Sequence, residues 1–152
     1  MKKIILLLLV VMFAFAGCTR MVIVDENEKV AEDEWGLSLT AENVTDSGMT
    51  IVFSQMNGKQ TGELETGDWY ALYKEENGEW VEVPYKLLTV DIAWNSVAYI
   101  IPKGDSVSFD VEWEWLYGKL SAGKYRIDKE VMDFRGTGDF DKKIYSLEFE
   151  IK

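Results

Sequence analysis

Apolar and polar residues alternate along the chain from about residue 35 onward. The clearest case lies at residues 106–115, where apolar positions alternate strictly with polar ones: Val107, Phe109, Val111, Trp113 and Trp115 against Ser106, Ser108, Asp110, Glu112 and Glu114. A period of two is typical of a β-strand with one face buried and the other in water. The pattern therefore predicts that Trp113 and Trp115 both point into a core.

Further short strands are predicted by similar patterns, and they are separated by turn residues. They cover residues 37–41, 49–54, 69–73, 80–83, 92–101, 125–131 and 145–151. Asn77-Gly78 predicts a tight hairpin turn between the third and fourth of these segments. Because no clean helical period appears, no substantial helix is expected. Seven or eight short strands predict an all-β protein, either an antiparallel β-sandwich or a small closed barrel.

The segment from Leu120 to Ile127 favours the sandwich, and specifically an immunoglobulin-like one. In such domains a tyrosine near the start of the sixth strand donates a hydrogen bond to the backbone a few residues upstream. Tyr125 has this place, and Gly123 permits the sharp turn before it. We therefore predict a tyrosine corner formed by Leu120, Gly123 and Tyr125. The alternative is an ordinary strand tyrosine that follows a glycine turn.

The resemblance to a known family extends over residues 35–152. The segments that carry it are Trp35–Thr45, Gly48–Gln55, Thr61–Leu64, Trp80–Pro84, Ala93-Trp94, Trp113–Gly118, Gly123–Ile127 and Met132–Arg135. In these segments the chain resembles the bacterial Ig-like domains of surface lipoproteins from anaerobic gut Firmicutes. The resemblance implies a fold and a surface location. It implies no catalytic activity and no ligand, so no functional residues carry over from the family.

Residues 1–17 have the organisation of a secretory signal peptide. Two lysines precede an unbroken apolar run of 12 residues at positions 4–15. A membrane-spanning helix needs about 20 residues, so this run is too short for a stable anchor. The alternative, a buried core helix, would show an amphipathic period, which is absent.

The motif at the end of this segment resembles the lipobox of bacterial lipoproteins. Phe15, Ala16 and Gly17 precede Cys18, and Phe15 stands where leucine is usual. The resemblance implies cleavage after Gly17 and acylation of Cys18. Two or three acyl chains would hold the protein on the extracytoplasmic face of the cell membrane. A free structural thiol at Cys18 is the alternative.

Residues 18–34 are predicted to form a lipidated N-terminus and an acidic tether. Six acidic side chains lie between positions 25 and 34, opposed only by Lys29. Such a segment is typical of a solvated linker. The alternative is a first strand or helix that docks on the domain through Met21 to Val24. The folded domain is then residues 35–152.

The amino-acid composition excludes several classes of function. The chain has no histidine, which excludes Ser–His and Cys–His nucleophiles and His-ligated zinc or haem. Its single cysteine cannot form an internal disulfide. With 27 acidic and 16 basic side chains, the net charge is −11, which argues against nucleic acid as a partner.

Candidate chemistry is sparse. Glu112 and Glu114 would lie about 7 Å apart on one strand face, a spacing at which carboxylates can hydrolyse glycosides. The alternation places both on the wet face, so an acidic surface is the better interpretation and a carboxylate-based hydrolase the weaker one. Asp133, Asp139 and Asp141 match no calcium loop. No catalytic residue, metal or cofactor is therefore expected.

Aromatic residues give the best indication of binding. Six tryptophans and seven tyrosines are many for one domain, and exposed rings stack on sugars or protein partners. Because end loops are the usual binding surface of Ig-like domains, we predict a patch. Its members are Trp69, Tyr70, Phe134, Arg135 and Asp139. The ligand would be a protein or a carbohydrate. The alternatives are a tryptophan-rich core without a ligand, and a structural spacer or subunit of an envelope complex.

Overall fold

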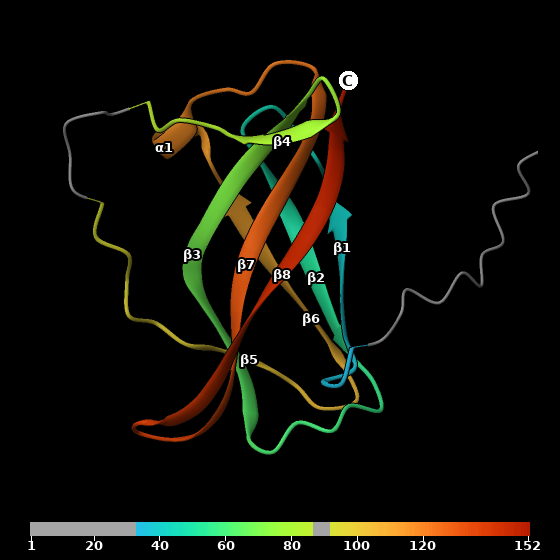
Figure 1. Ribbon diagram of the computed structural model, residues 1–152, viewed down its shortest axis with the longest axis vertical. Coiled ribbons are helices and arrows are strands. Elements are labelled where there is room, and N and C mark those ends of the chain that lie inside the picture. Colours follow the sequence, from blue (N-terminus) through green and yellow to red (C-terminus); the bar gives the residue numbers. More distant parts are fainter. Residues whose placement is uncertain (1–32, 87–91) are drawn as a thin grey trace, which may run out of the picture.

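Two antiparallel sheets pack face to face in a computed structural model that describes residues 33–86 and 92–152 (Figure 1). The elements are β1 (Leu37–Glu42), β2 (Gly48–Gln55), β3 (Glu63–Glu76), β4 (Glu79–Glu82), β5 (Tyr99–Ile101), β6 (Ser106–Glu112), α1 (Glu114–Tyr117), β7 (Gly123–Gly136) and β8 (Asp139–Ile151). The predicted all-β sandwich is confirmed. The predictions for residues 1–32, including the signal peptide, the Phe15–Gly17 motif and Cys18, concern residues outside the described ranges.

The strand order is that of an immunoglobulin-like sandwich. One sheet has the order β1-β2-β6, and the other has the order β4-β3-β7-β8, with β5 also paired to β3. These sheets correspond to strands A, B and E and to strands C, F and G of Ig domains. Strand D would lie beside E, but within the described ranges no strand pairs with the outer edge of β6. This open edge borders a cleft between the two sheets.

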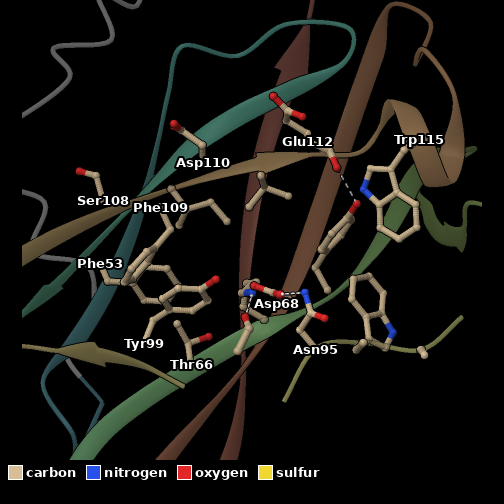
Figure 2. A pocket seen from close by; sticks show the side chains of 17 residues that line it. Phe53, Thr66, Asp68, Asn95, Tyr99, Ser108, Phe109, Asp110, Glu112 and Trp115 are labelled. Atoms are coloured by element: carbon tan, nitrogen blue, oxygen red, sulfur yellow. Dashed lines mark hydrogen bonds between the residues drawn. The ribbon is translucent and has the colours of Figure 1, made fainter. Parts of the chain in front are cut away.

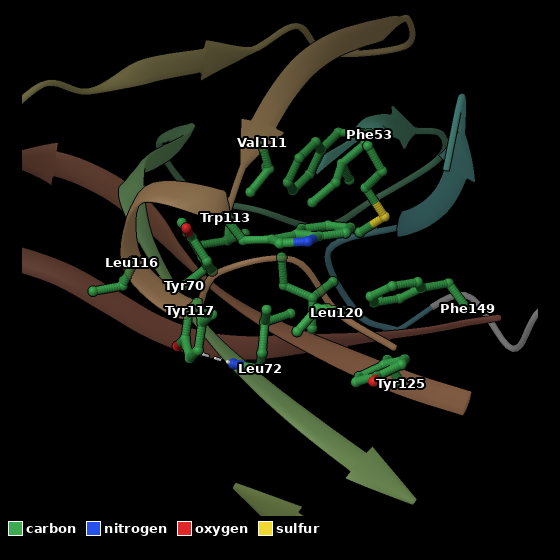
Figure 3. Close-up of a cluster of buried hydrophobic side chains, with 14 of the residues drawn as sticks. Phe53, Tyr70, Leu72, Val111, Trp113, Leu116, Tyr117, Leu120, Tyr125 and Phe149 are labelled. Carbon is green, nitrogen blue, oxygen red and sulfur yellow. Dashed lines mark hydrogen bonds between the residues drawn. The ribbon is translucent and has the colours of Figure 1, made fainter. Parts of the chain in front are cut away.

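The core lies between the sheets and is built around Trp113, which is 0% exposed (Figure 3). The ring of Phe149, from the opposite sheet, stacks on the indole at a centroid distance of 5.4 Å. The indole Nε1 donates a hydrogen bond of 2.8 Å to the Asp46 carbonyl oxygen, so the polar atom of this buried side chain has a partner. Trp113 therefore joins the two layers.

The prediction that Trp115 also points inward is wrong. The strand ends at Glu112, and the N–H groups of Leu116 and Tyr117 donate to the Trp113 carbonyl oxygen, which forms the single turn α1. This change from a period of two to a helical turn buries Leu116 and Tyr117 instead and leaves Trp115 54% exposed. The predicted 92–101 strand is likewise reduced to β5, because residues 92–98 pair with no described strand.

The Tyr125 side chain closes the corner at the start of β7. Its hydroxyl donates a hydrogen bond of 2.9 Å to the carbonyl oxygen of Ser121, four residues upstream. Gly123 adopts a φ of 152°, a conformation that other L-residues rarely adopt. Leu120 is buried, and its N–H donates to the Asp46 carbonyl oxygen at 2.8 Å. The three residues thus tie the turn to both sheets.

The folded domain begins at least two residues before the predicted boundary at Trp35. The Asp33 carboxylate accepts hydrogen bonds from the backbone N–H groups of Trp35 and Leu37, and it contacts Lys143 and the Tyr145 hydroxyl on β8. An acidic side chain that the sequence pattern assigned to the solvated tether is therefore docked on the sandwich, because a lysine and a tyrosine hydroxyl face it.

Candidate functional site

A cleft of about 620 Å³ opens between the two sheets, next to the outer edge of β6 (Figure 2). On the opposite side, β3 is covered by β4 at one end and by β5 at the other. Its middle, from Gly67 to Tyr70, lies between these two partners and lines the cleft. The volume is within the range of about 300–1,000 Å³ that is usual for ligand pockets.

Aromatic rings form two sides of this cleft. Tyr99 and Phe109 contact each other on one side, with their ring centroids 5.2 Å apart. On the other side Trp94 lies 6.0 Å from Trp115 and 5.3 Å from Tyr70, both in edge-to-face geometry. Figure 2 shows Tyr99 with Phe109 at one end and Trp115 at the other, with Asp68 and Asn95 between them. Rings held in this way offer flat apolar faces to a ligand.

A polar pair lies between the two aromatic sides. The Asn95 amide nitrogen donates a hydrogen bond of 3.0 Å to the Asp68 carboxylate. Hydrogen bonding to Asp68 and the negative charge of that carboxylate also raise the pKa of the Tyr99 hydroxyl. The cleft therefore combines apolar faces with one fixed carboxylate–amide pair, which can orient a ligand.

Lys129 is a buried cation at the base of the cleft and is only 4% exposed. Its ammonium group donates to the carbonyl oxygens of Gly67 and Trp69, the latter at 2.9 Å. These carbonyls belong to the irregular stretch of β3, where the register with β7 shifts between Thr66 and Tyr70. The lysine thus supplies donors where the β3–β7 ladder is interrupted. Burial lowers the pKa of this amine to about 8, although the charge of Asp68 opposes the shift.

The lowered pKa predicts a stability that rises with pH between about 8 and 10. In this window the unfolded chain keeps its proton on the lysine, whose ordinary pKa is about 10.4, while the folded chain releases it. Lys129→Met should abolish this rise, which urea unfolding at pH 7, 8, 9 and 10 would measure. The exposed Lys124→Met is the control and should keep the wild-type slope. An unchanged slope in Lys129→Met would contradict the assignment.

The five residues predicted as a binding patch do not come together. Tyr70 is buried at 3% exposure, and its hydroxyl donates to the Glu112 carbonyl oxygen; Trp69, beside it on β3, is half-buried. Phe134, Arg135 and Asp139 lie at the β7–β8 hairpin. Tyr70 pairs with Lys129, so Phe134 lies five residues further along β7, about 17 Å away. Only Tyr70 lines the cleft.

The hairpin part of that predicted patch is an ion-pair cluster. Arg135 Nε lies 2.8 Å from Asp139 Oδ1, and Arg135 Nη1 lies 2.9 Å from Asp141 Oδ2. The same nitrogen donates to the Thr61 hydroxyl at 2.9 Å. Asp139 and Asp141, which a bound metal cation would need as ligands, are therefore already paired with the guanidinium group. Among the described residues no group of three or more acidic or cysteine side chains is placed to hold a metal ion.

The geometry gives little support for catalysis. Glu112 ends β6 and Glu114 begins α1, so these residues do not share the strand face that the sequence pattern predicted. Asp110 and Glu112 border the cleft, but their side chains are exposed on the outer face of β6, whereas a general acid has to reach the substrate within hydrogen-bond distance. Lys129 donates to backbone carbonyls and not to Ser108, so no Ser–Lys nucleophile is formed in the described structure.

Sequence reasoning missed the residues that form the cleft, although one signal was present. Tyr125, Ile127, Lys129, Val131 and Asp133 occupy the inward positions of β7. Two charged residues on a face that is otherwise apolar mark buried polar sites, since burying an unpaired charge is costly. The position of Ala93, Trp94 and Asn95 along the cleft had no comparable signal.

The model of the bacterial Ig-like domain family matches residues 31–148. No curated protein and no solved structure gave a match. The helix that the structure describes, α1, has four residues and is far too short to cross a membrane.

Proposed function

The chain belongs to the bacterial Ig-like domain family, and from this premise we propose that it is a lipid-anchored binding module without catalytic activity. Such domains serve as surface or accessory modules. The anchor is Cys18, which follows the Phe15–Gly17 motif after a short apolar run. Anchored in this way, the sandwich stands on the extracytoplasmic face of the cell membrane.

The anchor predicts that Cys18→Ala releases the protein from the membrane fraction into the soluble one. Without the Cys18 thiol no acyl group can be attached to the protein. The mature protein is strongly acidic, so its net charge does not hold it on the membrane instead. Fractionation of cells followed by immunoblotting measures the effect. Thr19→Ala is the matched control and should remain in the membrane fraction. If Cys18→Ala stays membrane-bound, the lipid anchor is refuted.

The observation that carries the binding function is the cleft with its aromatic sides. A side chain as large and apolar as Trp115, 54% exposed beside a cavity, is a common feature of binding sites. The carboxylate–amide pair of Asp68 and Asn95 adds the polar groups that fix a ligand's orientation.

Binding at the cleft can be tested with the full chain in detergent solution. Soluble oligosaccharides and short peptides are added, and the indole N–H signals of Trp94 and Trp115 are followed by NMR. A ligand of the cleft should shift these two signals and leave that of the buried Trp113 unchanged. Trp115→Ala should weaken the binding. If no probe of either class shifts the cleft signals, the proposed binding function fails.

A further inference from the structure

The backbone direction of β6 follows from the hydrogen bonds at its two ends. Gln55 N–H donates to the Asp105 carbonyl at 3.0 Å, and Trp113 N–H donates to the Ser47 carbonyl at 2.9 Å. In an antiparallel ladder hydrogen-bonded pairs occur at every second residue. The odd-numbered residues of β6 therefore direct their N–H and C=O groups toward β2, and the even-numbered ones direct theirs to the outer edge.

Ser108 and Asp110 thus present two N–H and two C=O groups at the open edge. The Glu112 carbonyl faces the same way, because it accepts the hydrogen bond of 3.1 Å from the Tyr70 hydroxyl across the cleft. In the part of the chain that the structure describes, nothing pairs with the four groups of Ser108 and Asp110. An unpaired edge of this kind is a template for another strand.

The cleft lies directly beside this edge. An extended segment paired with β6 would take the place that strand D has in Ig domains. Every second side chain of that segment would enter the cleft, between the Phe109 and Trp115 sides. The inward face of β6 is ready for such contacts, because Val107 and Phe109 are only half-buried although they point between the sheets.

The charge beside the open edge of β6 determines which kind of segment can pair with it. Asp110 and Glu112 lie on the outer face of β6 and are exposed. The outward side chains of an added strand would lie beside these carboxylates, where opposite charges stabilise pairing and like charges oppose it. A second copy of β6 would bring the same carboxylates together. The acidic segment at residues 25–34 of this chain would also be repelled.

We infer that the cleft takes an extended, basic segment of a partner protein, which pairs with the outer edge of β6 as an additional strand. Its apolar side chains fill the cleft, and its lysines or arginines lie beside Asp110 and Glu112. This inference rests on the proposed binding function and specifies the class of ligand.

The probes for this test are synthetic peptides of about eight residues, a common strand length, in which Lys alternates with Val, Ile, Tyr or Phe. A second set has Glu in place of Lys, and a third set has Lys but is N-methylated at its Lys residues, whose N–H groups would pair with Ser108 and Asp110. The full chain in detergent solution is titrated with each set. Affinity is measured together with amide hydrogen exchange at Ser108 and Asp110, which face the added strand.

The Lys peptides should bind and slow exchange at both amides. The Glu peptides should bind about tenfold more weakly or worse, and N-methylation should remove binding by blocking the backbone pairing. Replacing Asp110 and Glu112 together by lysine should reverse the charge preference. The matched control is Glu148→Lys on the other sheet, which should change nothing.

Three results would overturn the inference. One is that no Lys peptide binds at millimolar concentration, and another is that N-methylated peptides bind as well as the others. The third is that only a soluble oligosaccharide such as chitohexaose shifts the Trp94 and Trp115 signals, with no protection of the Ser108 and Asp110 amides. In that case the proposed binding function stands and strand addition fails. If neither class of probe shifts the indole signals, both fail.

Discussion

Trp113→Ala is expected to lower the free energy of unfolding by about 3–5 kcal/mol, the usual cost of truncating a fully buried tryptophan. The side chain is 0% exposed and stacks on Phe149, which itself stacks on Tyr125 at a centroid distance of 5.8 Å. Its removal leaves a cavity between the sheets and takes a donor from the Asp46 carbonyl oxygen. This oxygen keeps the hydrogen bond from Leu120 N–H, so the lost packing dominates.

The matched control is Trp115→Ala, two residues along the chain. Trp115 is 54% exposed, so its truncation should change the free energy of unfolding by about 0.5 kcal/mol or less. Guanidinium unfolding followed by circular dichroism measures both variants without depending on tryptophan fluorescence. Equal losses for the two variants would mean that both indoles lie in the core, contrary to the structure.

This pair of tryptophans shows how far the hydrophobic pattern predicts the fold. Alternation identified the strand that holds Val107 to Val111 and the strand that ends at Ile151, because one-sided burial imposes a period of two. It could not show that the strand ends at Glu112. The helical turn that follows is formed by hydrogen bonds between backbone groups. The alternation of apolar and polar side chains continues unchanged through Trp115, so it gives no sign of this turn.

The candidate site was less predictable than the fold. The cleft exists because β3 shifts register between Thr66 and Tyr70 and because residues 92–98, three of which line the cleft, pair with no described strand. Both features depend on contacts between distant segments, such as Lys129 with the Gly67 carbonyl. Sequence reasoning placed aromatic residues at the ends of the sandwich, whereas the structure gathers them at its open side.

The largest electrostatic effect is expected at Asp133, which is 2% exposed. Its Oδ2 accepts hydrogen bonds from the Thr61 backbone N–H at 2.7 Å and from the Thr61 hydroxyl at 3.0 Å, while Oδ1 accepts from Gly62 N–H. These bonds hold the segment before β3 against β7. Asp133→Asn keeps the size of the side chain but turns an amide N–H₂ toward backbone donors. It should cost about 2–4 kcal/mol of stability at pH 7.

The cost of Asp133→Asn should depend on pH in a defined direction. Burial alone would raise the pKa of Asp133, but the hydrogen bonds from Thr61 and Gly62 and the charge of Arg135 outweigh it and lower the pKa. A carboxylate whose pKa is lower in the folded state stabilises the fold above its unfolded pKa of about 3.9 and loses this contribution as the pH falls through the folded value. The free-energy difference between wild type and Asp133→Asn should therefore be constant from pH 7 to about 5 and shrink below about 4.

Urea unfolding across this pH range measures that difference, with Asp141→Asn as the control. Asp141 also pairs with Arg135, at 2.9 Å, but its side chain is 70% exposed, so its loss should cost about 1 kcal/mol or less. The two variants thereby separate two contributions to stability. One comes from a buried carboxylate that accepts backbone hydrogen bonds, and the other from an exposed carboxylate that is paired with the same arginine. If both variants lose equal stability, the arginine rather than the backbone donors of Thr61 and Gly62 stabilises this end of the sandwich. If the Asp133→Asn difference persists unchanged at pH 3, the lowered pKa of Asp133 is contradicted.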